Sequence, residues 1–303
     1  MKHFSRRHFL AGTALAGLGP AVAFSPGRVA NAASEVSAAG AGMKLGMVTY
    51  QMGKDMSVDE LIALCQKSGL AGVELRTTHA HKVESDLTGA QRAEVKKKFA
   101  DAGVAIAGLG TTFDFHSKNP DEVRKSIEGA KEYAQLAADV GALGIKVRPN
   151  GVHKDEDREK TYERIGKSLG EVAASAAGLG VQVWLEVHGS EGSKEPASIR
   201  KMIDHAGHPN ALVCWNCNGG ETDTNGSIRA NFDLLKHVIG EVHINDIGLP
   251  KYPWQELFSL LKEINYQGFC LAEIEYNPQP ERFMTYYRTL FDLYTGRYRD
   301  PNA

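Results

Sequence analysis

From residue 43 onward, short apolar runs alternate with longer amphipathic segments. Short runs of apolar and β-branched residues that end at Gly, Pro or Asn are typical of buried strands. Eight segments fit this description, and we predict strands at residues 44–50, 72–76, 104–110, 144–148, 181–188, 211–217, 241–244 and 269–274.

The segments between these strands have the longer apolar spacing and the end signals of helices. Ser57 with Glu60 forms a capping box, and Gly103 and Gly141 stand where two helices should end. We predict helices at residues 58–68, 88–101, 120–140, 155–179, 196–206, 227–237, 253–264 and 280–294.

Strand–helix alternation repeated eight times in about 250 residues is typical of a (β/α)₈ TIM barrel. An open, doubly wound α/β sheet is the alternative, but no G-x-G-x-x-G follows the first strand. We therefore expect one barrel domain over residues 43–303, with no second domain.

The first residues are typical of an export signal. Arg6 and Arg7 stand directly before an apolar, Ala/Gly-rich stretch, and the small residues Ala30-Asn31-Ala32 offer a cleavage site. The arginine pair resembles a twin-arginine signal, against the alternative of a basic, disordered N-terminus on a cytosolic protein. We expect a signal peptide at 1–32, a flexible leader at 33–42, the twin-arginine machinery as partner, and a periplasmic protein without stable membrane insertion after cleavage.

Composition narrows the functional classes. The chain has 303 residues and a formal charge of -2, and the predicted signal contains four basic residues and no acid. The exported form is therefore more acidic still, which argues against a nucleic-acid partner. Cys214 and Cys217 form a C-x-x-C, but without a second pair they are better explained as a buried cysteine beside a loop cysteine.

In barrels of this type the active site lies at the carboxyl ends of the strands. The last four predicted strands contribute Glu186, Asn216, His243 and Glu273, which are separated by 30, 27 and 30 residues. This spacing is about one strand–helix unit, so the four side chains should meet at the barrel mouth. Two carboxylates, an imidazole and an amide oxygen suit one divalent ion, such as Mn²⁺, Mg²⁺, Co²⁺ or Zn²⁺.

Several motifs resemble the xylose isomerase-like barrels grouped as sugar phosphate isomerases and epimerases. They are Leu185-Glu186-Val187-His188-Gly189, Val242-His243-Ile244-Asn245-Asp246, Pro253-Trp254-Gln255-Glu256-Leu257 and Gly268-Phe269-Cys270-Leu271-Ala272-Glu273. The resemblance implies a small carbohydrate substrate and metal ligands at Glu186, Asn216, His243 and Glu273. It also implies that Glu186 and Glu273 move protons around an enediolate, which the metal would stabilise as a Lewis acid.

Four further residues are candidates for binding the substrate: Glu74, Lys146, Arg148 and His188. For Lys146 and Arg148 a structural ion pair is an equally good explanation. The pair His79 and His81 forms an H-x-H, which is either an additional metal or substrate element or two exposed histidines.

Two positions depart from the family pattern. Asn216 stands where the family has Asp, with Asn218 as an alternative ligand nearby, and Leu249 stands about where ketose epimerases have an arginine. The main hypothesis is a sugar isomerase or epimerase. A keto-sugar lyase or dehydratase and a non-catalytic sugar-binding barrel remain alternatives, whereas the export signal and the acidic charge argue against a DNA-repair phosphodiesterase.

Overall fold

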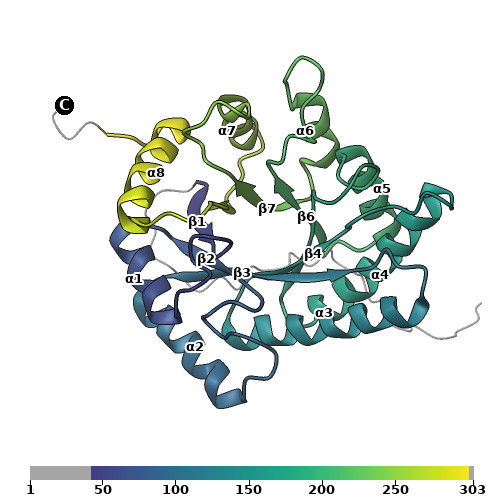
Figure 1. Cartoon of the computed structure of the whole chain (residues 1–303), viewed down its shortest axis with the longest axis horizontal. Helices are drawn as coiled ribbons and strands as arrows, with labels where there is room; N and C mark the ends of the chain where they lie inside the picture. Colours follow the sequence, from purple (N-terminus) through teal and green to yellow (C-terminus); the bar gives the residue numbers. More distant parts are fainter. Residues whose placement is uncertain (1–41, 300–303) are drawn as a thin grey trace, which may run out of the picture. The chain divides into compact units, whose positions relative to one another are not determined.

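The computed structural model describes residues 42–299, which form a closed barrel of eight parallel strands (Figure 1). The strands pair in sequence order, and the first also pairs with the last. They are β1 (Lys44–Val48), β2 (Gly72–Arg76), β3 (Ala105–Asp114), β4 (Gly144–Arg148), β5 (Gln182–Glu186), β6 (Ala211–Asn216), β7 (Ile239–Ile244) and β8 (Phe269–Ala272). The prediction of a single-domain (β/α)₈ barrel is confirmed.

Each strand is followed by a helix on the outside of the barrel (Figure 1). The helices are α1 (Val58–Ser68), α2 (Gly89–Ala102), α3 (Pro120–Val140), α4 (Arg158–Ala177), α5 (Pro196–Ala206), α6 (Arg229–Leu235), α7 (Trp254–Glu263) and α8 (Pro280–Thr295). Ser57 and Glu60 form the predicted capping box. Thr88 is the N-cap of α2 and not its first helical residue, because its side chain accepts a hydrogen bond from the backbone of Gln91.

The largest difference from the predicted elements is in β3, which continues to Asp114 instead of ending at Gly110. The residues after Gly110 are mostly polar, so the apolar pattern of the sequence did not predict the extension. The hydroxyl of Thr111 donates to the carbonyl of Lys146, at 2.6 Å, and so fastens the extension to β4. The extension places Asp114 opposite Arg148 in the register of the two strands.

The inside of the barrel is divided between apolar side chains, with the large ring of Trp184 among them, and a charged layer. The ring of Trp184 occupies the space that side chains would need at Gly108, Gly144 and Gly240, which lie on three other strands. Closer to the mouth the interior is polar, and the buried ionisable residues there are Glu74, Lys146, Glu186, Glu241 and His243. Burying so many ionisable groups is unfavourable unless they pair, so this layer is the part of the barrel that requires an explanation.

The predicted signal at 1–32 and residues 33–41 of the predicted leader lie outside the described residues. Between residues 42 and 299 no helix is both long and apolar enough to cross a membrane.

Candidate active site

A cavity of about 660 Å³ opens at the carboxyl ends of the strands. Glu186, Asn216 and Glu273 line it, on strand ends or directly after them. Loop residues from β1 and from the segment after β8, among them Tyr50 and Tyr276, complete its walls. The position is the one expected for the active site of a TIM barrel.

The four residues predicted as metal ligands come together in the structure. Glu186, His243 and Glu273 each offer an atom within 4.8 Å of the other two. Nδ1 of His243 lies 3.7 Å from Oε1 of Glu186 and 3.8 Å from Oε2 of Glu273. Asn216 is buried beside them and donates from Nδ2 to Oε1 of Glu186, at 2.8 Å.

Two buried atoms in this group lack a hydrogen-bond partner among residues 42–299. They are Oδ1 of Asn216 and Nδ1 of His243. A buried polar atom without a partner is unfavourable by about 1–3 kcal/mol, so such atoms need a ligand to satisfy them. An amide oxygen, an imidazole nitrogen and two carboxylates are a donor set for a divalent cation, and these residues therefore fit one.

Glu186 also contacts two positively charged side chains of the protein. Nζ of Lys146 donates to its Oε2 at 2.7 Å, and Nε of Arg148 lies 3.4 Å from the same oxygen. Burial opposes ionisation of Glu186, but Lys146 and His243 outweigh it and hold the pKa of this carboxyl well below its usual range. Glu186 is therefore ionised in the metal-free protein, and its charge is already partly neutralised.

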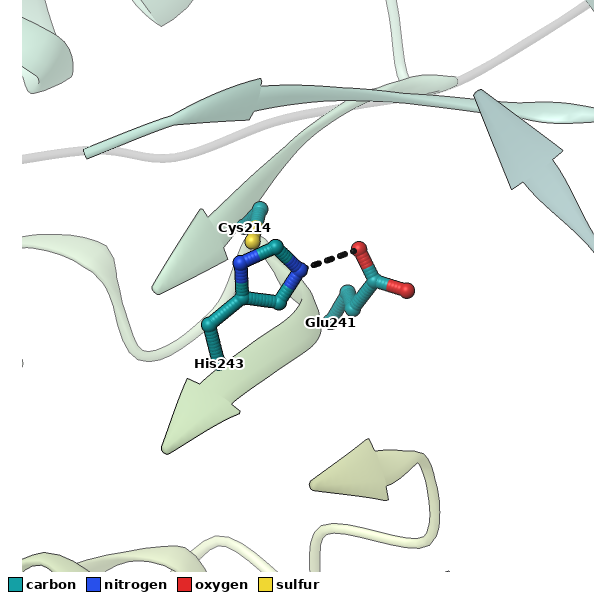
Figure 2. A group of neighbouring side chains, drawn as sticks. All are labelled: Cys214, Glu241 and His243. Atoms are coloured by element: carbon teal, nitrogen blue, oxygen red, sulfur yellow. Dashed lines mark ion pairs between the residues drawn. The ribbon is translucent and has the colours of Figure 1, made fainter. Parts of the chain in front are cut away.

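His243 is held from below by a second layer of buried groups. Its Nε2 lies 3.0 Å from Oε2 of Glu74 and 3.5 Å from Oε2 of Glu241. Figure 2 shows Glu241 and Cys214 beside the imidazole ring. Burial and the adjacent Glu74 raise the pKa of Glu241 to about 8, so Glu241 is protonated at neutral pH. A carboxylate on the second nitrogen fixes the ring and its tautomer, which leaves Nδ1 for the ligand group above.

Cys214, Glu241 and His243 also lie close enough to hold a cation. However, Cys214 and Glu241 are sealed inside the barrel and do not line the cavity. Burial raises the pKa of the Cys214 thiol, which keeps it protonated. We therefore interpret this trio as the support of the imidazole.

The predicted substrate residues divide into two groups. Arg148 and His188 line the cavity, and burial lowers the pKa of His188, so its imidazole is neutral. Glu74 and Lys146 are buried beneath the cavity, in contact with His243 and Glu186 respectively. The roles predicted for these four residues remain predictions. In the structure, Glu74 and Lys146 contact candidate metal ligands and do not line the cavity in which a substrate would bind.

The structure also locates the residues for which the sequence left more than one interpretation. Asn216 is buried among the ligand candidates, whereas Asn218 is exposed at the cavity rim. His81 bridges the loop after β2, with Nε2 donating to the Arg76 carbonyl and Nδ1 accepting from the Val83 amide. Leu249 lies on the rim. The four cysteines are free and buried, which agrees with the interpretation of Cys214 and Cys217 as structural.

Two residues of the site were missed by the sequence analysis. Glu241 stands two positions before His243 on β7, so strand alternation places both side chains inward. Arg76 ends β2 and lines the cavity. Their residue types alone did not distinguish them from exposed strand ends.

Comparison with known proteins agrees with this geometry. Residues 62–287 match the family model "Xylose isomerase-like TIM barrel", and the chain belongs to this family. It is 24% identical over 251 residues to a D-psicose 3-epimerase of Enterocloster bolteae, which covers 77% of this chain and 82% of that protein. The expectation of a sugar isomerase- or epimerase-like enzyme is confirmed at this level.

Two solved structures share the fold. A 3-keto-D-glucoside 4-epimerase from E. coli superposes with a TM-score of 0.68 at 17% identity, over 84% of this chain and 99% of that one. The IOLI protein with a bound zinc atom superposes with a TM-score of 0.70 at 15% identity, over 85% of this chain and all of that one.

Proposed function

We propose that this protein is a divalent metal-dependent epimerase or isomerase of a small keto-sugar. The observation that carries the proposal is the convergence of Glu186, His243 and Glu273 beside the cavity, where the buried carbonyl oxygen of Asn216 has no hydrogen-bond partner among residues 42–299. The names of the relatives, D-psicose 3-epimerase and 3-keto-D-glucoside 4-epimerase, support the substrate class and the reaction. The IOLI protein, which shares the fold, binds a zinc atom, and this supports the proposal of a metal in this protein.

A bound divalent ion would act as a Lewis acid on the substrate carbonyl and the adjacent hydroxyl, and so stabilise an enediolate. Glu186, Asn216, His243 and Glu273 would hold it. Glu186 ends β5 and Glu273 directly follows β8, with β6 and β7 between these strands, so both would reach one bound ligand from different sides.

The two carboxylates are not equivalent. Both oxygens of Glu186 accept hydrogen bonds, from Asn216 and Lys146, whereas the carboxylate of Glu273 accepts none from residues 42–299. We assign proton removal from the carbon next to the carbonyl to Glu273, because one of its oxygens would hold the ion while the other would be free to take a proton. We assign proton exchange on the other side to Glu186, and a hydrogen bond to a substrate oxygen to His188.

Exchange with solvent deuterium tests the proposal before any product is known. A keto-sugar incubated with the metal-loaded enzyme in D₂O should gain deuterium at the carbon next to the carbonyl, as followed by NMR. Glu273→Gln keeps the shape of the side chain and should slow the exchange by about 10²–10⁴. Metal content must be measured for each variant, because a lost ion would imitate a lost base.

A matched control is Glu275→Gln, which removes an exposed carboxylate two residues further along the same loop and should leave exchange unchanged. A protein that binds keto-sugars but exchanges no proton at any metal loading would instead be a sugar-binding barrel.

We also propose that the chain is exported through the twin-arginine route to the periplasm. Arg6 and Arg7 before the apolar stretch, followed by Ala30-Asn31-Ala32, support this proposal.

A further inference from the structure

Two arginines on one wall of the cavity have no carboxylate to themselves among residues 42–299. Arg76 ends β2 and Arg148 ends β4, and β3 lies between these strands. Among residues 42–299, neither guanidinium group donates a hydrogen bond. The only carboxylate within ion-pair distance of Arg148 in that range is Glu186, 3.4 Å from Nε, and Lys146 already binds the same oxygen at 2.7 Å.

The acid opposite Arg148 in the strand register makes its hydrogen bonds to other residues. Asp114 stands opposite Arg148 in the register of β3 and β4. Its Oδ1 accepts from Nδ1 of His116, and its Oδ2 accepts from Nδ2 of Asn150, both at 2.7 Å. Both oxygens are therefore occupied, and Arg148 keeps its positive charge toward the cavity.

The guanidinium group of Arg76 is held by an uncharged aromatic ring, which leaves its positive charge in place. Its guanidinium carbon lies 5.2 Å from the centre of the Tyr50 ring, which holds the group by a cation–π contact. Its stem leans over β3 at Gly110, where a Cβ would come within 2.9 Å of the Arg76 Cγ. A Cβ there would also collide with the carboxylate of Glu74, so the absence of a side chain at Gly110 makes room for both Glu74 and the stem of Arg76.

This wall differs from the rest of the cavity lining. The acidic side chains of the lining other than Glu186 are Asp246, Glu273 and Glu275, and all three follow β7 or β8. The β2–β4 wall therefore presents two guanidinium groups, and a bound divalent ion beside Glu186 would add to their positive charge. Fixed guanidinium groups suit carboxylates and phosphates, which they bind with charge-assisted and often bidentate hydrogen bonds.

We propose that Arg76 and Arg148 form an anion-binding subsite, so that the substrate is an acidic keto-sugar that carries a carboxylate or a phosphate group. This inference rests on the proposed function, because it concerns the substrate of the same cavity. The anionic group lies at the β2–β4 wall, and the reacting carbon lies toward Glu273 after β8.

Matched probes test the subsite. D-fructose, D-fructuronate and D-fructose 6-phosphate offer the same kind of keto-sugar without a charge, with a carboxylate and with a phosphate. We expect at least one acidic probe to bind about tenfold to a hundredfold more tightly than D-fructose to the full-length metal-loaded protein, by calorimetry, because hydrogen bonds between charged groups are the strong ones. Preference for one acid identifies the group, and equal binding of all three probes would overturn the inference.

Variants of the two arginines test whether these residues cause the preference for acidic keto-sugars. Arg76→Gln and Arg148→Gln should each reduce the affinity for the preferred acid toward that for D-fructose, while the affinity for D-fructose itself changes little. Arg148→Lys, which keeps the charge, should restore part of the loss and shows that the site still folds. Lys251→Gln is the matched control, since Lys251 also lines the cavity but is exposed at its rim. An equal loss in this control would mean that the overall charge of the cavity selects acids, and the subsite would be refuted.

Failure of this inference is distinguishable from failure of the proposed function. If neutral keto-sugars exchange their proton but acids bind no better, the subsite is wrong and the enzyme stands. If acids bind in an arginine-dependent way without any proton exchange, the subsite stands and the enzyme assignment falls.

Discussion

Asn216 does two things at once in the candidate metal centre. Its Nδ2 donates to Glu186 at 2.8 Å, while its buried Oδ1 has no partner among the described residues and remains for a ligand. The amide adds no charge, and Lys146 already binds Glu186. Both features weaken attraction for a cation, so we expect metal binding in this protein to be limited by charge and not by the number of donors.

Replacing Asn216 by Asp should therefore separate stability from metal affinity. Without metal, the change removes the hydrogen bond to Glu186 and brings a second carboxylate beside it, so the melting temperature should fall. With metal, the added charge should tighten binding at least about tenfold, since a unit charge at about 4 Å contributes roughly 1–4 kcal/mol in a partly screened site. Calorimetric titration of the metal-free protein with Mn²⁺ and with Zn²⁺ measures both the affinity and its change.

The control for this variant is Asn218→Asp, which adds the same charge at the exposed rim and should change affinity much less. If Asn218→Asp has the larger effect, Asn218 and not Asn216 is the amide ligand.

At the scale of elements, the loop after β6 is built around one buried acid. The amide of Gly219 donates to Oε2 of Glu221 at 2.9 Å, and Nδ2 of Asn231 donates to the Glu221 carbonyl at 2.8 Å. Glu221 is 1% exposed, and its burial raises the pKa of its carboxyl to about 7. Asn218 and Gly219 of this loop line the cavity, so the hydrogen bond of Gly219 connects Glu221 to the cavity wall.

The raised pKa predicts a pH dependence of stability. The folded protein holds the Glu221 proton more tightly than the unfolded chain does, so this stabilisation is fully present below the ordinary glutamate pKa of about 4.5 and is lost as the pH rises through about 7. The melting temperature should therefore have a falling component between about pH 5 and about pH 8. Glu221→Gln, which cannot ionise, should remove that component.

The matching control is Glu275→Gln, which removes an exposed carboxylate of the cavity and should keep the slope of the wild type. A Glu221→Gln variant with the wild-type slope would show that other groups cause the dependence.

At the scale of the whole molecule, the candidate metal ligands come from separate strands and meet only in the closed barrel. Export after folding would allow the protein to acquire its metal before it leaves the cytoplasm, which agrees with the proposed twin-arginine route. The predicted signal lies outside the described residues, so the test must be made in cells.

We predict that Arg6→Lys combined with Arg7→Lys keeps uncleaved precursor in the cytoplasm, as measured by cell fractionation and by the mass of the protein. Arg28→Lys, which changes a single arginine outside the pair, should be exported like the wild type. Normal export of the double variant would exclude the twin-arginine route.

Much of the fold was predictable because its signals are local. The capping box of Ser57 and Glu60 and the glycines at helix ends act within one turn of chain, and they are visible in sequence. The extension of β3 was not predictable, because polar residues after Gly110 satisfy the strand only through contacts with β4.

The sequence by itself determined the order of the elements, the closed barrel and the four residues that converge at its mouth. Regular spacing suffices for this, since it fixes both the strand and the height of each residue. Only the tertiary structure decided that Glu74 and Lys146 lie beneath the cavity, that the pKa of Glu241 is raised and that Arg76 lines the cavity. These properties depend on side chains from other strands, because the charge and pKa of a buried group are set by its neighbours in space and not by its neighbours in the chain.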